Sequence, residues 1–141
     1  IDFCWRAQLA GYRIRVEPRS TVFHVGGGTL PNNSPQKIYL NFRNNLCMLF
    51  KNLSPGTFWP VLFSRMVLDG MAALVFLVQG HPDFFKKVFR AHIDFHRQRK
   101  SLHEKRRAIQ RHRVARPHGI LRNSIILLHA FGYRTFDKVM R

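Results

Sequence analysis

The sequence predicts an α/β fragment, in which a short helix and two strands are followed by a mainly α-helical tail that associates with a membrane. Three features carry this prediction. Apolar residues recur at helical spacing over most of the chain, and they alternate with polar residues only near its N-terminal end. Of the 141 residues, 24 are Lys or Arg and only 7 are Asp or Glu, so the formal net charge is +17. Such an imbalance predicts a polyanionic partner.

Residues 2–10 predict a short helix. Trp5 and Leu9 lie four residues apart, which places them on one face, and Gly11 is suited to end the helix.

Two short strands are expected next. In residues 13–17 polar and apolar side chains alternate, which is typical of a half-buried strand, and Pro18 ends the pattern. Residues 21–25 predict a second strand, on which Val22 and His24 share one face.

Three helical patterns follow the strands. Residues 37–53 carry one apolar stripe, and residues 58–78 are almost entirely apolar. The second stretch is nearly long enough to span a bilayer, but Arg65 and Asp69 at its centre argue against a simple span. Residues 84–112 read as one long basic helix.

These patterns divide the chain into three parts. Residues 1–36 form the α/β part, residues 37–80 the amphipathic and apolar helices, and residues 81–141 the basic helix with a terminal apolar patch at 124–136. The patch is expected to be a short helix or strand. Positive charge concentrates in the last part, which has 16 basic and 4 acidic residues, against 8 and 3 in residues 1–80.

Several short motifs stand in a characteristic order. They are a D-x-x-x-R at Asp2 and Arg6, the pair Gly11-Tyr12, and His24 followed by Gly26, Gly27 and Gly28. In this order and spacing the chain resembles the C-terminal part of the catalytic domain of glycosyltransferase family 2, which has the GT-A fold. Residues 39–53 and 68–74 are similar to the tail of a bacterial branch of that family. The resemblance covers residues 1–80 and extends only loosely over residues 82–116.

The resemblance implies an enzyme that transfers a sugar, with inversion, from a nucleotide-sugar donor to a lipid-linked or polysaccharide acceptor. It also implies a divalent metal, Mg or Mn, in the complete enzyme. The acidic pair that deprotonates the acceptor would lie before Ile1, and so would the donor-binding half. We therefore expect the chain by itself to be inactive as a transferase.

His24 is the strongest site candidate. The resemblance places it near the metal or the donor diphosphate, and Gly26, Gly27 and Gly28 would allow backbone N–H groups to face the diphosphate oxygens. The alternative is a buried strand histidine followed by a flexible turn.

Two further residues are candidates for the reaction. Asp2 would position the acceptor or the base, or it would only form a surface ion pair with Arg6. Arg43 would offer donors near the mouth of the active site, and the alternative is a solvated helix face.

Basic residues after position 81 are candidates for contact with an anionic membrane surface. They are Lys86, Lys87, Arg90, Arg97, Arg99 and Lys100. The expected location is the inner face of the cell membrane, as a peripheral cytoplasmic protein, since Cys4 and Cys47 show neither metal-ligand spacing nor a disulfide framework. The rival interpretation is a small basic helical protein that binds nucleic acid. Against that interpretation, the basic residues are not interleaved with an aromatic platform.

Overall fold

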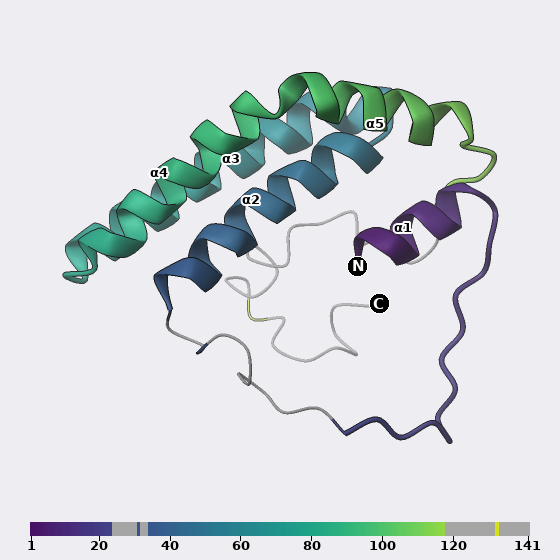
Figure 1. Ribbon diagram of the computed structural model, residues 1–141, viewed down its shortest axis with the longest axis horizontal. Helices are drawn as coiled ribbons and strands as arrows, with labels where there is room; N and C mark the ends of the chain where they lie inside the picture. The colour runs from purple at the N-terminus through teal and green to yellow at the C-terminus, as the bar shows by residue number, and fades with distance from the viewer. Residues whose placement is uncertain (24–30, 32–33, 118–131, 133–141) are drawn as a thin grey trace.

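The computed structural model describes residues 1–23, 31, 34–117 and 132, and in this part of the chain the regular structure is helical (Figure 1). The helices are α1 (Asp2–Leu9), α2 (Pro35–Asn52), α3 (Pro55–Val78), α4 (Pro82–Arg97) and α5 (Arg99–Arg111). Helices α2, α3 and α4 pack against one another, and α3 runs opposite to the other two. Helix α5 continues from α4 over the C-terminal end of α2, and α1 lies against that same end.

The prediction of an α/β fragment with two strands is wrong. Residues 13–17 adopt no strand, and neither do residues 21–23, the described part of the second predicted strand. Both segments are exposed. A strand is held by the N–H and C=O groups of a neighbouring strand, and the described residues supply no such neighbour. Alternation of side chains indicates which face a strand would bury, but not whether a partner exists.

The predicted helices are present, with one difference. Helices α2, α3 and α4 each begin at a proline, at residues 35, 55 and 82, where the missing N–H has no intrahelical partner to lose. The helix expected over residues 84–112 is divided at Gln98, and the division places α5 across the end of α2. Most of the predicted patch at 124–136 lies outside the described residues.

The apolar core gathers around Phe50 of α2. Its ring meets those of Phe58 and Phe95 edge-on, with centroids 5.2 Å and 5.6 Å apart, and that of His103 at 4.9 Å. Four buried leucines complete the cluster, namely Leu46 of α2, Leu53 at the end of α2, Leu62 of α3 and Leu102 of α5. The core therefore joins α2, α3, α4 and α5 at one end of the bundle.

The C-terminal end of α2 is capped by side chains of α5. Arg106 donates hydrogen bonds from one guanidinium nitrogen to the carbonyl oxygens of Phe50, at 2.6 Å, and Leu53, at 2.9 Å. Gln110 Nε2 lies 3.2–3.3 Å from the carbonyl oxygens of residues 51, 52 and 53. The last carbonyl groups of a helix have no partner within it, so these two side chains supply what the helix lacks.

The end of α1 is joined to the chain that follows α5. The carbonyl oxygen of Leu9 accepts hydrogen bonds from the N–H groups of Val114 and Ala115, at 3.0 and 3.2 Å. Gly11 makes this approach possible, since its φ is +91° and a Cβ there would lie 3.1 Å from the Val114 side chain. The predicted helix stop at Gly11 is thus confirmed.

Arg106→Met should lower the free energy of unfolding by about 2–3 kcal/mol, because it removes charge-assisted hydrogen bonds to buried carbonyl groups while keeping the volume of the side chain. Arg107→Met is the matched control, since Arg107 is exposed on the same helix. Urea unfolding followed by far-UV circular dichroism measures both variants. Equal stability of the two would contradict the capping role.

Candidate functional site

The residues that the resemblance places at the donor diphosphate lie outside the described part of the chain. They are His24, Gly26, Gly27 and Gly28. Their roles stay predictions.

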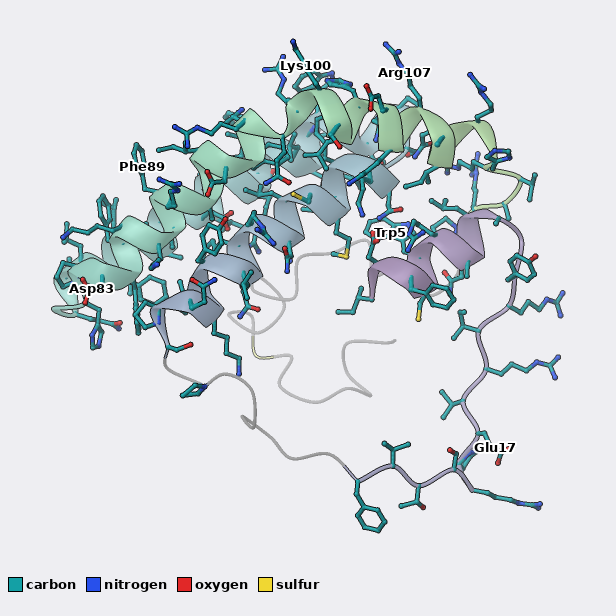
Figure 2. All side chains as sticks on the ribbon, in the orientation of Figure 1. Trp5, Glu17, Asp83, Phe89, Lys100 and Arg107 are labelled. Atoms are coloured by element: carbon teal, nitrogen blue, oxygen red, sulfur yellow. The ribbon has the colours of Figure 1, made fainter. Side chains whose placement is uncertain are left out.

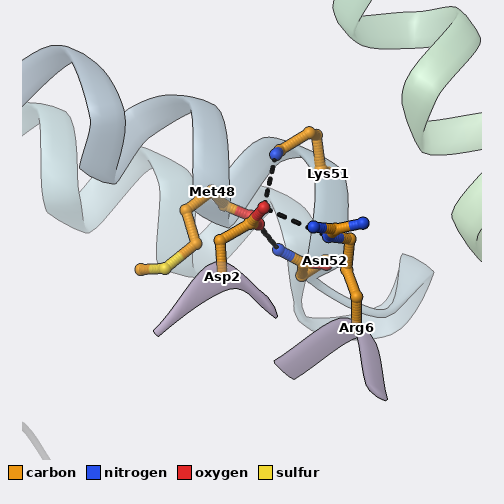
Figure 3. A network of polar contacts seen from close by, with 5 residues as sticks. All are labelled: Asp2, Arg6, Met48, Lys51 and Asn52. Atoms are coloured by element: carbon orange, nitrogen blue, oxygen red, sulfur yellow. Dashed lines mark hydrogen bonds and ion pairs between the residues drawn. The ribbon is translucent and has the colours of Figure 1, made fainter. Parts of the chain in front are cut away.

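Asp2 lies at the junction of α1 and α2 (Figure 3). Its carboxylate accepts hydrogen bonds from Lys51 Nζ at 2.9 Å and Asn52 Nδ2 at 2.7 Å, and it pairs with Arg6 Nε at 3.2 Å. Asn52 is 1% exposed and also donates to the carbonyl oxygen of Met48 at 2.9 Å. The predicted Asp2–Arg6 ion pair is confirmed, and the contacts with α2 add a structural role that spacing within α1 did not reveal.

Opposing effects act on the pKa of Asp2. Burial raises it, but hydrogen bonds from Lys51 and Asn52, together with the charges of Lys51 and Arg6, outweigh burial and hold the pKa of the carboxyl below its ordinary value. Asp2 is thus a stabilised carboxylate at neutral pH. In this environment it is suited to holding cationic or N–H groups, and a general base would need a higher pKa.

Arg43 lies on α2 more than two turns before Lys51, so the structure shows no contact between it and Asp2. Its guanidinium donates to Asn44 Oδ1 at 2.9 Å and to Tyr39 Oη at 3.3 Å. Tyr39 in turn donates to Asp94 Oδ2 of α4 at 2.9 Å. Arg43 therefore belongs to a polar network that links α2 to α4.

Asp94 is the acidic centre of that network, and sequence reasoning missed it. Arg90 Nε lies 3.0 Å and Arg97 3.6 Å from its carboxylate. The hydrogen bond from Tyr39, with the bond and charge of Arg90 and the charge of Arg97, lowers the pKa of Asp94. The spacing of four residues between Arg90 and Asp94 was a signal in the sequence for their ion pair. No pattern in the sequence indicated the contact of Asp94 with Tyr39 of α2.

The exposed basic side chains of α4 and α5 form what we call the basic surface. Its members are Lys86, Arg90, Arg97, Arg99, Lys100, Lys105, Arg107 and Arg111, and Lys87 beside them is half-buried. Lys100 and Arg107 point away from the packed helices (Figure 2). The predicted membrane-contact residues are thus accessible to solvent, apart from the partly covered Lys87.

A buried carboxylate joins α3 to α4. Asp69 is 1% exposed, and its carboxylate lies 2.7 Å from an Arg65 guanidinium nitrogen and 3.2 Å from His92 Nε2. The pair Arg65–Asp69 was expected from spacing, but His92 was missed as its partner. The signal was a histidine on the apolar side of a helix, where a polar ring atom needs a partner.

Helix α3 also has an apolar face that no described residue covers. Trp59 is 73% exposed, and the exposed apolar side chains of this face follow one another at helical spacing, namely Trp59, Phe63, Val67, Met71, Leu74 and Val78. Among the described residues α3 alone is long and apolar enough to cross a membrane. Its length and composition fit association with a membrane.

The described residues offer no ligand set for the divalent metal that the resemblance implies. Within residues 1–23 and 34–117, no three His, Cys, Asp or Glu side chains gather closely enough to hold a metal ion. A groove of about 460 Å³ beside α1 is lined by Phe3, Arg6, Ala7, Tyr12 and Ile14, and it lacks carboxylates.

Comparison with known proteins finds no family model that matches the chain and no curated protein or solved structure similar to it.

Asp2→Ala should lower the free energy of unfolding by about 1–2 kcal/mol at pH 7, because the amide of Asn52 and the ammonium of Lys51 both lose their partner. The native pKa of Asp2 is lowered, so its stabilising effect is present above the ordinary pKa near 3.8 and is lost as the pH falls through the native value. The difference between wild type and variant should therefore shrink as the pH falls below 3.8 and through the native pKa of Asp2.

Glu104→Ala is the control, because Glu104 is an exposed acid on α5. Urea unfolding of both variants at pH 7 and at acid pH tests the prediction. A difference that persisted unchanged in acid would show that the carboxylate charge is not the cause.

Proposed function

We propose that this chain is the membrane-associated C-terminal part of an inverting glycosyltransferase, which moves a sugar from a nucleotide-sugar to a lipid-linked or polysaccharide acceptor at the inner face of the cell membrane. The motif order from Asp2 to Gly28 supports the class of enzyme. In such a transfer the acceptor hydroxyl forms a new bond to the anomeric carbon as the bond to the nucleoside diphosphate breaks. The hydroxyl proton passes to a base, and negative charge grows on the departing diphosphate.

The observation that carries the membrane part of this proposal is the uncovered apolar face of α3. An exposed apolar stripe that runs from Trp59 to Val78 is a feature of interaction surfaces, because burying it releases water from a large area. The basic surface on α4 and α5 lies on the same bundle, and an anionic leaflet offers both the acyl chains that suit the apolar face and the phosphates that suit the basic side chains.

Nucleic acid is the second candidate partner, and the basic surface is the observation that favours it. Phosphate contacts by Lys and Arg supply affinity without base recognition. This alternative assigns no role to the apolar face of α3, so we rank it below the membrane.

The chain should pellet with anionic vesicles and much less with neutral ones, and added salt should weaken binding without abolishing it. Replacing Arg99 and Lys100 by Gln should weaken binding about tenfold or more, since each basic residue near anionic lipid contributes about 1 kcal/mol. Arg13→Gln with Arg15→Gln removes the same charge from the exposed segment after α1 and is the control. DNA is added as a competitor. Equal pelleting with neutral vesicles, or DNA binding without vesicle binding, would overturn the membrane assignment.

In the complete enzyme, His24→Ala should lower kcat roughly 10²-fold, which is the loss expected when one group that stabilises transition-state charge is removed. His112→Ala, at the end of α5, is the control. Release of nucleoside diphosphate from the nucleotide-sugar measures turnover, and vesicle binding of both variants checks that the helical part is intact. Wild-type turnover in His24→Ala would remove this residue from the site.

A further inference from the structure

Helix α3 has the dimensions of a membrane-spanning helix. It has 24 residues, which corresponds to about 36 Å at the helical rise, and the hydrocarbon core of a bilayer is about 30 Å thick. Length and composition alone therefore allow α3 either to cross the membrane or to lie within one leaflet. Its surroundings distinguish these arrangements.

One face of α3 packs against α2 and α4. Asp69, near the middle of the helix, is buried and held by Arg65 and by His92 of α4. Arg65 also lies over the ring of Phe42 of α2, with its guanidinium carbon 5.5 Å from the ring centroid. The charges within α3 are thus tied to α2 and α4, because separating α4 would take His92 away from Asp69 and separating α2 would take the Phe42 ring away from Arg65.

The neighbour α4 cannot accompany α3 through a bilayer. It packs along α3 in the opposite direction, and it exposes Lys86, Arg90 and Arg97 over its length. A crossing by α3 would place these cations in hydrocarbon, where charged side chains are costly. A helix within the headgroup boundary avoids that cost, because long Lys and Arg side chains beside it reach the phosphates.

We propose that α3 lies in the plane of a single anionic leaflet, with the face from Trp59 to Val78 immersed and the side held by Asp69 turned toward the protein. The proposal rests on the proposed attachment of the chain to a membrane and deepens it. The partner of this face is the boundary between lipid headgroups and acyl chains. Phe89 of α4 is a further large apolar side chain that is exposed on the bundle.

Tryptophan fluorescence distinguishes the arrangements, because the chain has only two tryptophans, Trp5 and Trp59. Trp5→Phe leaves Trp59 as the sole probe, and it removes a buried indole N–H that has no hydrogen-bond partner among the described residues. Two further variants are made in the Trp5→Phe background, each with Trp59→Phe and one new tryptophan farther along the face. The new tryptophan is Val67→Trp in one variant and Val78→Trp in the other. Each protein is bound to anionic vesicles whose lipids carry bromine at stepped depths in the acyl chain.

An in-plane helix gives one shallow depth for all three probes, within about 5–10 Å of the headgroup boundary. Acrylamide quenching of Trp59 should also fall roughly threefold on binding. A probe at position 67 near the bilayer centre, with shallow probes at 59 and 78, would show a spanning helix and overturn the proposal. Phe3→Trp, with both native tryptophans replaced by Phe, is the control, because Phe3 is exposed on α1. Lipid quenching of this control equal to that of Trp59 would also overturn the proposal.

Failure of the proposed attachment gives a separate result, in which the protein does not pellet with vesicles and no probe is quenched by bromine. Shielding of Trp59 from acrylamide without lipid, together with a dimer in sedimentation velocity, would assign the face to a second copy and overturn the leaflet assignment.

Discussion

The unpaired carbonyl groups at the C-terminal end of α2 are the constraint on which the arrangement of the helices depends. Helices α1, α3 and α5 meet at this end of α2. Helix α5 donates hydrogen bonds to the carbonyl groups, and α1 and the start of α3 pack beside them. Arg106 reaches the carbonyl oxygens while its guanidinium carbon lies 4.4 Å from the centroid of the Phe58 ring, so one side chain joins α5 to both α2 and the start of α3. Burial lowers the pKa of Arg106, yet a guanidinium stays charged under all ordinary conditions. A residue that is always cationic is well suited to hold these carbonyl groups at any physiological pH.

The same end of the bundle fixes which face of α3 turns inward. Once Phe58 packs on Phe50, the helical repeat places Leu62, Asp69 and Ala73 on the buried side. Asp69 then requires partners, which Arg65 and His92 provide. The uncovered apolar face is a consequence of this packing, because a helix that is apolar on all sides and packs on one leaves the opposite one exposed.

The helices of this chain were largely predictable from local signals, whereas the strands and the interhelical contacts were not. A proline before an apolar repeat marks the start of α2, α3 and α4 within a few residues. This signal is local, because the fixed φ and the missing N–H of proline are properties of that one residue. The alternation in residues 13–17 is equally local, but a strand needs a distant partner that no local pattern reveals. For the same reason Asp2 was predictable as a partner of Arg6, and not of Asn52, which lies fifty residues away along the chain.

The surplus of positive charge lies on the exposed surface of α4 and α5. Asp2, Asp69 and Asp94 each contact two basic side chains, and each links one helix to another. With the acids engaged in this way, the remaining Lys and Arg side chains of α4 and α5 face solvent with few negative neighbours. Mutual repulsion among them opposes the compact state, and an anionic surface relieves it. The pairing that holds the helices together thus also leaves a cationic exterior on a bundle that exposes the apolar face of α3, and this combination is the basis for proposing an anionic leaflet rather than a neutral apolar partner.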